Sequence, residues 1–192
     1  MLILASQSPR RQQLLQQMGL TFTVKVADID ETMDPSRPPK EQVAEVSARK
    51  AAAIAAISQR DDVIIAADTI VVVDDIILGK PTSPDDAVRM LKMLSGRSHS
   101  VMTGVTVRCG EKSVSHTEIT QIRFRDLTDT EIEAYVASGD PMDKAGSYGI
   151  QNGAAVFVCG MDGDYFNVMG LPLCSLTLLL RQFGVAVLGE KG

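Results

Sequence analysis

The chain has 192 residues, of which 45% are hydrophobic and 22% are charged, and its formal net charge at pH 7 is −5. This length and composition suit a folded domain with a sizeable core, and they exclude a disordered chain. The acidic balance is opposite to that of proteins that coat a nucleic-acid backbone, so a phosphate site here needs a local basic cluster.

The N-terminal part of the chain predicts two strands and two helices. Ser8 is a good N-cap and Pro9 suits the first turn of a helix, which ends at Gly19. A later alanine-rich segment carries apolar residues on one side at helical spacing. The predicted elements are a buried strand at 2–5, the helix from Pro9, a strand at 22–26, an acidic loop at 28–39 and a helix at 41–58.

The middle of the chain predicts a central strand, a helix and a hairpin. The uninterrupted apolar run 63–67 is typical of a strand that is buried on both faces. Ser83 caps a helix that has two aspartates in its first turn, where the helix dipole favours negative charge. The further elements are strands at 70–73 and 76–78, a helix at 84–95, and hairpin strands at 100–107 and 113–124.

The C-terminal part predicts two more helices around a glycine-bearing loop. The sequence Thr128-Asp129-Thr130-Glu131 forms a capping box. The elements are a helix from there to residue 138, a loop at 139–153, a strand at 154–158 and a helix at 173–183. The whole pattern predicts an α/β fold in one domain over residues 1–192, with a mixed twisted sheet, flanking helices and two lobes around a cleft.

The segment Ser6-Gln7-Ser8-Pro9-Arg10-Arg11 is a candidate phosphate-binding loop. It joins a strand to a helix N-terminus, where free backbone N–H groups, the helix dipole and two guanidinium groups attract an anion. Two arginines in a first helical turn are otherwise unfavourable, because that end of a helix prefers acidic side chains. The alternative is a capped helix whose arginines are merely solvated.

Asp68 is a candidate general base or metal ligand. It ends the apolar run 63–67, and ligands of open α/β sheets gather at the carboxyl ends of strands. A carboxylate there can deprotonate water or hold a divalent cation, and the neighbouring Thr69 could support either role. The alternative is an ordinary turn aspartate.

Further charged residues carry weaker signals. Asp28, Asp30 and Glu31 form a carboxylate cluster in a loop, which matters only if the candidate base folds close to it and is otherwise solvated. Lys50 and Lys80 could each neutralise a polyphosphate, although surface lysines are common in any protein.

Residues 143–151 predict a functional loop, because they combine two glycines and the polar Gln151 with no hydrophobic periodicity. The sequence around Ser147 is close to a nucleophile elbow. We reject that interpretation, because no apolar strand leads into the serine and both histidines precede it. We expect structural roles for His99 and His116. Walker A and dinucleotide glycine motifs are absent from the sequence.

Taken in order, seven segments between residue 2 and about residue 183 resemble the Maf family of nucleoside triphosphate pyrophosphatases. These segments are Ser6–Arg11, Ala66–Thr69, Gly79–Pro81, Ser95–His99, Thr103–Val105, Asp143–Gln151 and Gly170–Leu173. The resemblance implies a fold similar to that of the inosine triphosphate pyrophosphatases, and usually a homodimer. It also implies hydrolysis between the α- and β-phosphates that depends on a divalent metal cation, Mg²⁺ or Mn²⁺.

The resemblance further implies a substrate and a set of roles. The segment 143–151 resembles the dTTP/UTP branch of the family rather than the 7-methyl-GTP branch, so dTTP and UTP are the expected substrates. One departure is Gly79, where relatives often carry glutamate. By the family pattern, Asp68 matches the proton acceptor, and further catalytic residues are matched by Glu31, Lys50 and Lys80. The phosphate loop is matched by Ser8, Arg10 and Arg11, and the metal would be held by Glu31 and Asp68. Positions linked to substrate choice are matched by Arg10, Thr69 and Gln151.

Two other functions stay open at this stage. A non-catalytic nucleotide-binding regulator of septum formation would keep Arg10 and Arg11 but would not need Asp68. A phosphatase would release inorganic phosphate stepwise instead of pyrophosphate.

The sequence also indicates a cytoplasmic location. The nearly uncharged run 1–8 is too short for a signal peptide and precedes its arginines instead of following them. No apolar run reaches the length that spans a bilayer. The three cysteines are scattered and odd in number, which favours a reducing compartment over a disulfide framework or a zinc site. We therefore expect neither a membrane nor a nucleic acid as a partner.

Overall fold

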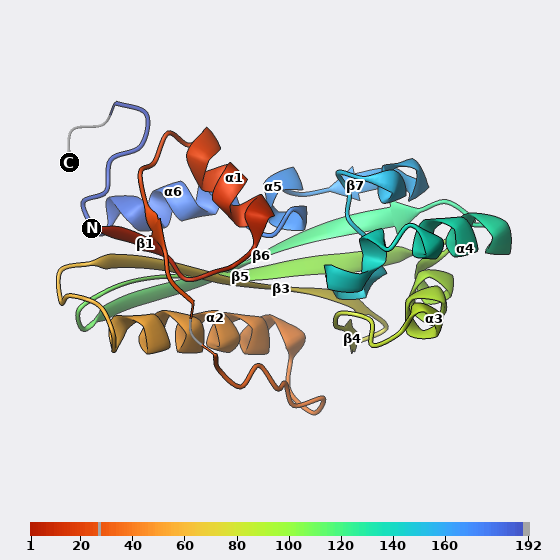
Figure 1. The fold of residues 1–192 in the computed structure, drawn as a ribbon, viewed down its shortest axis with the longest axis horizontal. Coiled ribbons are helices and arrows are strands. Elements are labelled where there is room, and N and C mark those ends of the chain that lie inside the picture. The colour runs from red at the N-terminus through yellow and green to blue at the C-terminus, as the bar shows by residue number, and fades with distance from the viewer. Residues whose placement is uncertain (27, 190–192) are drawn as a thin grey trace. The chain divides into compact units, whose positions relative to one another are not determined.

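A computed structural model describes residues 1–26 and 28–189 of the chain, shown as a ribbon in Figure 1. In that part the strands are β1 (Leu2–Leu4), β2 (Thr23–Val24), β3 (Val63–Val73), β4 (Ile76–Leu78), β5 (Ser98–Cys109), β6 (Lys112–Phe124) and β7 (Val158–Asp162). The α-helices are α1 (Pro9–Gln17), α2 (Pro39–Ala55), α3 (Pro84–Leu94), α4 (Asp129–Ala137), α5 (Tyr165–Val168) and α6 (Leu173–Arg181). Short 3₁₀ helices are η1 (Asp140–Asp143), η2 (Ala145–Ser147) and η3 (Gly153–Phe157).

The described strands form one seven-stranded sheet in the order β2-β1-β3-β5-β6-β7, with β4 paired to β3. Both β2 and β3 run parallel to β1. In contrast, β4 runs antiparallel to β3, and β7 runs antiparallel to β6. The prediction of an α/β fold with a mixed sheet and flanking helices is therefore confirmed.

The chain folds into two compact units. Unit 1 consists of Met1–Asp68, Thr103–Glu118 and Gly170–Gly192, and unit 2 consists of Thr69–Met102 and Ile119–Met169. The boundary between the two units falls inside β3, β5 and β6, so each unit takes part of its sheet from these long strands.

The core of unit 1 follows the period of two that is typical of a strand. Alternate residues of β1 and β3 point to one face of the sheet, where α2 packs against them. Figure 1 shows α2 on this face and α1 and α6 on the other. The buried residues of this cluster are Ile3 from β1, Ala5 just after it, Ile64 and Ala66 from β3, and Ala51 and Ile54 from α2.

A glycine allows α2 to lie unusually close to β5. A Cβ atom at Gly104 would lie 2.3 Å from the carbonyl oxygen of Val43, which is a distance that no side chain tolerates. Further along the same contact, the hydroxyl oxygens of Ser47 and Thr106 lie 2.7 Å apart. The small residues of the alanine-rich helix thus bring its backbone close to the sheet.

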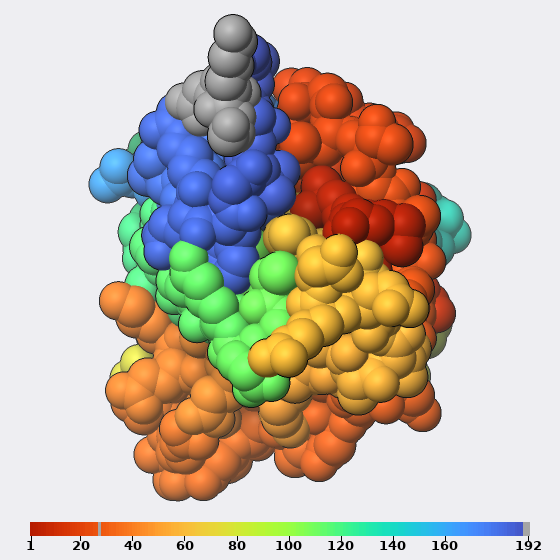
Figure 2. Space-filling model, turned by 90° about the vertical axis from the view of Figure 1, so that its left-hand side faces the viewer, coloured from red at the N-terminus to blue at the C-terminus, as the bar shows by residue number. Residues whose placement is uncertain are grey.

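Segments of unit 1 that are distant in sequence meet on the face shown in Figure 2, where the N-terminal residues (red and orange), the β5–β6 turn (green) and the residues after 170 (blue) adjoin one another. The ammonium group of Lys112 donates to the carbonyl of Gln182 and lies 4.5 Å from the centre of the Phe183 ring. These contacts connect the C-terminal segment to the hairpin.

Unit 2 has a separate core beneath α3 and α4. Both helices begin at the predicted caps: Ser83 accepts from the N–H of Asp86, and Thr128 and Glu131 form the capping box. The core includes an aromatic cluster in which Phe124 packs edge-on against His99, Tyr148 and Phe157. None of the helices in the described part of the chain is long and apolar enough to cross a lipid bilayer.

One predicted strand is wrong, and another is shorter than predicted. Residues 154–158 are not a strand, because residues 153–157 form η3 and the strand β7 begins only at Val158. The buried residues of this segment are Ala154 and Phe157, whose spacing of three suits a 3₁₀ turn and not the alternation of a strand. The predicted strand 22–26 is present as the shorter strand Thr23–Val24, which pairs with Ile3 and Leu4 of β1.

The position of Asp68 within its strand also differs from the prediction. The strand does not end at Ala67: β3 continues without a break to Val73, so Asp68 lies in its middle. The β-branched residues after Thr69 extend the strand, and Val71 to Val73 pair with β4. A charged residue inside an otherwise buried strand is more unusual than one at its end, because it needs a partner to offset the burial of its charge.

Candidate active site

The start of α1 forms a compact set of hydrogen bonds around Arg11. Ser8 is the N-cap, and its hydroxyl accepts from the N–H of Arg11. The Ser6 hydroxyl accepts from the N–H of Ser8 and from Nη1 of Arg11, both at 3.2 Å. The Nε of Arg11 donates to the carbonyl of Gly170 at 2.7 Å. The sequence predicted the cap, but it gave no role to Ser6 or to the Gly170 carbonyl.

Arg11 is a buried cation in unit 1, with 9% of its surface exposed. Burial lowers the pKa of Arg11, the Asp68 carboxylate opposes this effect, Arg10 lowers the pKa further, and Glu31 raises it. A guanidinium stays protonated at physiological pH in spite of such shifts. The start of α1 therefore presents a fixed positive charge in the field of two carboxylates.

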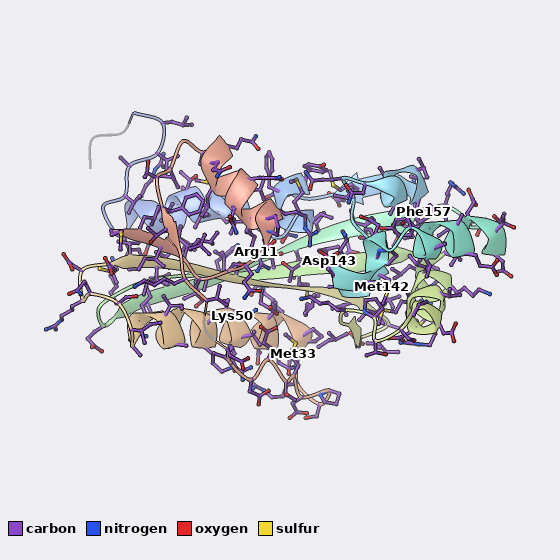
Figure 3. The ribbon with its side chains drawn as sticks, viewed as in Figure 1. Arg11, Met33, Lys50, Met142, Asp143 and Phe157 are labelled. Atoms are coloured by element: carbon purple, nitrogen blue, oxygen red, sulfur yellow. The ribbon has the colours of Figure 1, made fainter. Side chains whose placement is uncertain are left out.

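Lys50 connects these two carboxylates. Its Nζ lies 2.7 Å from Oδ1 of Asp68 and 3.0 Å from Oε1 of Glu31. The Lys50 and Asp68 side chains are only 15% and 13% exposed, whereas that of Glu31 is 57% exposed. Figure 3 shows Arg11 extending from α1, and Lys50 on the side of α2 that faces the strands.

Sequence periodicity explains why Lys50 and Asp68 meet. Asp68 continues the row of Ile64 and Ala66, which faces α2 because side chains alternate along a strand. Lys50 lies four residues before Ile54, so the two share the buried face of α2. Lys50, which carried only a weak signal in the sequence, is therefore the direct partner of Asp68, the candidate base.

The acidic loop before α2 contributes one of its three predicted carboxylates to this cluster. Glu31 reaches Lys50, whereas Asp30 is exposed and accepts a hydrogen bond from the N–H of Thr32 at 2.8 Å. Asp28 is exposed. From the sequence, this loop has a role only if it folds close to Asp68. Glu31 does so, because it and Asp68 both contact Lys50.

The remaining predicted site residues, Thr69, Lys80 and Gln151, belong to unit 2. Lys80 and Gln151 are exposed, and their loops touch, because the N–H of Gly146 donates to the carbonyl of Gly79 at 3.0 Å. Among the described residues, the Gln151 amide hydrogen-bonds to no loop carbonyl. Its polar groups are thus directed to solvent.

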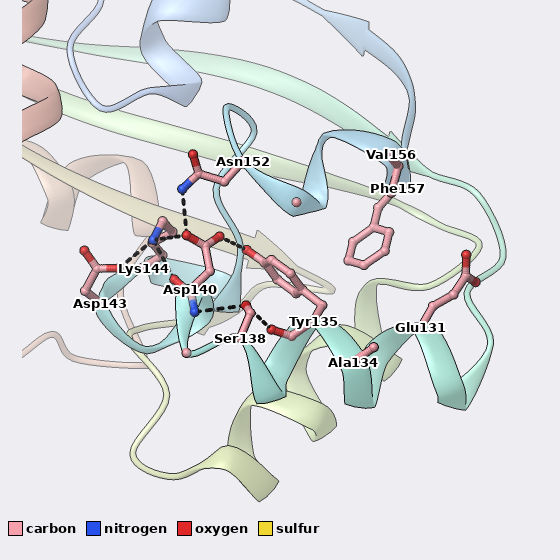
Figure 4. A pocket seen from close by; sticks show the side chains of 12 residues that line it. Glu131, Ala134, Tyr135, Ser138, Asp140, Asp143, Lys144, Asn152, Val156 and Phe157 are labelled. Carbon is pink, nitrogen blue, oxygen red and sulfur yellow. Dashed lines mark hydrogen bonds and ion pairs between the residues drawn. The ribbon is translucent and has the colours of Figure 1, made fainter.

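An open pocket of about 850 Å³ in unit 2 contains none of the predicted site residues in its lining (Figure 4). Its apolar wall comes from α4 and η3, and its polar end is formed by Asp140, Lys144 and Asn152. Its lining consists of Glu131, Ala134, Tyr135, Ser138, Gly139, Asp140, Asp143, Lys144, Asn152, Gly153, Val156 and Phe157. The size of a pocket alone therefore does not locate the predicted chemistry.

The histidines and Ser147 take structural positions. Burial lowers the pKa of His99 to about 4, and its Nε2 lies 2.7 Å from the Tyr148 hydroxyl. His116 is exposed and lies 3.3 Å from Glu118. Ser147 is fully buried and donates to the sulfur of Met90, so it is not an accessible nucleophile.

Comparison with known proteins places the sequence in a family. A family model described as Maf-like protein matches residues 1–183. A dTTP/UTP pyrophosphatase of Moorella thermoacetica is 50% identical over 98% of both chains. One from Desulforamulus reducens is 46% identical over 97% of this chain and 98% of that one.

A solved structure of a HAM1 protein from Coxiella burnetii is 15% identical, covers 94% of this chain and 98% of its own, and aligns with a TM-score of 0.48. The family assignment rests on the sequence matches, because they extend along almost the whole chain at high identity. The chain belongs to the Maf family.

Proposed function

We propose that this protein hydrolyses dTTP and UTP to the nucleoside monophosphate and pyrophosphate. Two relatives of matching length bear the name dTTP/UTP pyrophosphatase. The observation that carries the proposal is the cluster in unit 1, where Lys50 contacts both Asp68 and Glu31. This combination of fixed cations and carboxylates suits phosphoanhydride hydrolysis.

The cationic residues have the task of neutralising the triphosphate. Water attacks the α-phosphorus only when the charge of the surrounding oxygens is balanced. Arg11 is held rigidly by Ser6 and Gly170, so its charge is in place before the substrate arrives. Arg10 and Ser8 complete the phosphate loop at the helix N-terminus. In the same proposal Lys80 contributes a further positive charge.

Asp68 has the task of orienting and deprotonating the attacking water. A general base must lie within hydrogen-bond reach of the proton that it abstracts, so its position must be fixed. Lys50 holds Oδ1 of Asp68 at 2.7 Å, and we assign the attacking water to the other carboxylate oxygen. This arrangement keeps the base in one orientation on the rigid strand β3.

Glu31 and Asp68 fit a divalent cation that is shared with the substrate. Nucleotide enzymes bind Mg²⁺ through one or two carboxylates, water molecules and phosphate oxygens. Among the described residues, no group of three or more His, Cys, Asp or Glu side chains could hold an ion alone. Two converging carboxylates are what the shared mode requires, and a cation bound there would neutralise phosphate charge.

Gln151 has the task of reading the base, together with Thr69 and Arg10. Uracil and thymine present two carbonyl groups on either side of an N–H, and a glutamine amide offers both a donor and an acceptor. The exposed Gln151 amide is available for this pairing. A purine presents a different edge and a larger ring, so we expect GTP and ATP to be poor substrates.

The test combines a nucleotide panel with a change at the base. Wild-type protein should release pyrophosphate from dTTP and UTP in preference to purine triphosphates, with Mg²⁺ or Mn²⁺ present. Asp68→Asn should fold normally and lower turnover by at least about a hundredfold, because a general base contributes on this scale.

The matched control is Asp61→Asn, which changes an exposed aspartate just before the same strand and should leave turnover unchanged. Near wild-type turnover in a folded Asp68→Asn protein would contradict the assigned base. Nucleotide binding without any pyrophosphate release would instead favour a non-catalytic regulator.

A further inference from the structure

Asp140 is the centre of a hydrogen-bonded network in unit 2 (Figure 4). Its Oδ2 accepts from the Tyr135 hydroxyl at 2.6 Å. Its Oδ1 accepts from the Asn152 amide at 2.6 Å and from Nζ of Lys144 at 3.2 Å. Both carboxylate oxygens are thus engaged by donors from α4 and from the loop that follows η1.

The network reaches the residue two positions before Gln151. The Tyr135 hydroxyl donates to Asp140 and accepts from the N–H of Gly149 at 3.2 Å. Since the Tyr135 hydroxyl donates its hydrogen bond to Asp140, its oxygen lone pairs are left to accept from the N–H of Gly149. The carboxylate therefore orients the group that holds the loop backbone.

The side chain of Lys144 supports the same glycine from another direction. A Cβ atom at Gly149 would lie 2.7 Å from Cε of Lys144, so the lysine stem packs directly against the glycine backbone. Nζ of this lysine donates to the carbonyl of Asp140 at 2.5 Å and to the carboxylate of Asp143 at 2.6 Å. Asp140 thus also fixes the stem that Gly149 rests on.

On the other side of Gln151, the next residue is bound to the same carboxylate. Asn152 donates from its side chain to Asp140. Gly149 and Asn152 lie on either side of Gln151 in the sequence. Gly149 is connected to Asp140 through the Tyr135 hydroxyl, and Asn152 donates to Asp140 directly. Gln151 itself is exposed and contributes nothing to the network.

We propose that Asp140 is a positioning residue for base selection, which fixes the backbone on both sides of Gln151 and so sets the direction of its amide. This inference rests on the proposed function, in which Gln151 reads the pyrimidine. Asp140 itself does not touch the substrate. Its role is to reduce the freedom of a short exposed loop, so that less order has to be imposed when a nucleotide binds.

The charge state of Asp140 agrees with this role. Burial raises the pKa of Asp140, and the hydrogen bonds from Tyr135, Asn152 and Lys144 together outweigh this effect, so the pKa lies below its ordinary value. At neutral pH the group is a carboxylate that accepts from all of its partners at once.

The test is a double-mutant cycle between Asp140→Ala and Gln151→Ala. Asp140→Ala should lower the ratio of kcat/KM for dTTP to that for GTP roughly three- to tenfold, the range that corresponds to a typical hydrogen bond. The change should appear mainly as a higher KM for dTTP, with kcat nearly unchanged. In the Gln151→Ala background, Asp140→Ala should change the ratio by less than about twofold, because its effect passes through Gln151.

The outcomes separate this inference from the proposed function. If Gln151→Ala lowers the ratio but the two effects simply add, Asp140 acts independently of Gln151 and the inference is overturned while the proposed function stands. If Gln151→Ala alone leaves the ratio unchanged, Gln151 does not read the base, so its proposed role and the inference on Asp140 both fail, whereas pyrophosphate release from dTTP and UTP is tested separately by the nucleotide panel. A matched control is Asp129→Ala, which removes an exposed carboxylate of α4 paired with Lys92 and should leave the ratio unchanged.

We expect Asp140→Ala to fold, because Lys144 keeps its partner Asp143 when Asp140 is lost. A second variant, Tyr135→Phe, tests the inference independently if Asp140→Ala does not fold. Tyr135→Phe keeps the ring in the core and removes only the hydroxyl that links Asp140 to Gly149. It should shift the ratio in the same direction, and Tyr165→Phe should not. An unchanged ratio in a folded Tyr135→Phe protein would overturn the inference.

Discussion

At the scale of single residues, the candidate site depends on the burial of charges that neutralise one another. Lys50 is held between Asp68 and Glu31, and all three are positioned by elements of unit 1. Arg11 differs from the neighbouring Arg10 because it is buried and bonded to Gly170. One arginine of the pair thus belongs to the framework of the site as well as to its chemistry.

This difference predicts separate effects for the two arginines. Arg11→Ala should lower stability by about 1–3 kcal/mol, because a buried carbonyl and hydroxyl lose their donor. It should also weaken dTTP binding ten- to a hundredfold, which is the range for a charge-assisted hydrogen bond, and weaken thymidine binding less. Arg10→Ala, at a position that is only partly buried, should weaken dTTP binding and lower stability less than Arg11→Ala does.

Thermal unfolding and calorimetric titration with dTTP and thymidine would measure both effects. Equal losses for nucleoside and triphosphate would show that Arg11 does not act on the phosphates. A larger loss of stability in Arg10→Ala than in Arg11→Ala would contradict the structural role given to Arg11.

At this scale the residue patterns themselves indicated Asp68 and the Ser6–Arg11 loop, whereas a catalytic role for Lys50 was predicted only through the family resemblance. A lysine in an alanine-rich helix has no distinctive pattern of its own. Its role follows from the phase of α2 relative to β3, which is a tertiary property. The network around Asp140 was missed for the same reason, because its members come from a helix and an aperiodic loop.

At the scale of elements, strand β3 and helix α2 bring the candidate base and its partner together. The sequence correctly predicted α2 and the helix caps, because capping residues and apolar periodicity are local signals. It wrongly ended the strand before Asp68, since a charge after an apolar run looks like a boundary. Strand pairing beyond that point keeps the strand intact, and pairing is not encoded locally.

The aromatic cluster of unit 2 connects β5 to the loop after η2 through His99 and Tyr148, and it predicts acid sensitivity. The pKa of His99 is about 4 in the folded protein and about 6.5 in an unfolded chain, because burial disfavours the charged ring. Unfolding therefore takes up a proton between these values. His99 should leave stability unaffected above pH 6.5 and lower it by about 3 kcal/mol as the pH falls to 4.

Urea unfolding at several pH values, followed through a spectroscopic signal from residues of unit 2, would measure how the free energy of unfolding depends on pH. His99→Gln should remove about this part of the pH dependence, even if the variant is less stable throughout. His116→Gln changes an exposed histidine and should retain the full dependence. The same slope in His99→Gln and in the wild-type protein would contradict the burial argument.

At the scale of the whole molecule, two compact units each have their own core and their own share of the predicted site residues. Unit 1 holds the phosphate loop and the Lys50 cluster, and unit 2 holds Gln151, Lys80 and the Asp140 network. In the proposed function, most of the groups that act on the phosphates belong to unit 1, and Gln151, the residue proposed to read the base, belongs to unit 2.

The central claim is that water attacks the α-phosphorus of a pyrimidine triphosphate. The most direct test is hydrolysis of dTTP in water enriched in oxygen-18, followed by mass spectrometry of the products. Attack at this phosphorus should give dTMP that carries one labelled oxygen, together with unlabelled pyrophosphate. Label in inorganic phosphate or pyrophosphate, with unlabelled dTMP or dTDP as the other product, would contradict it.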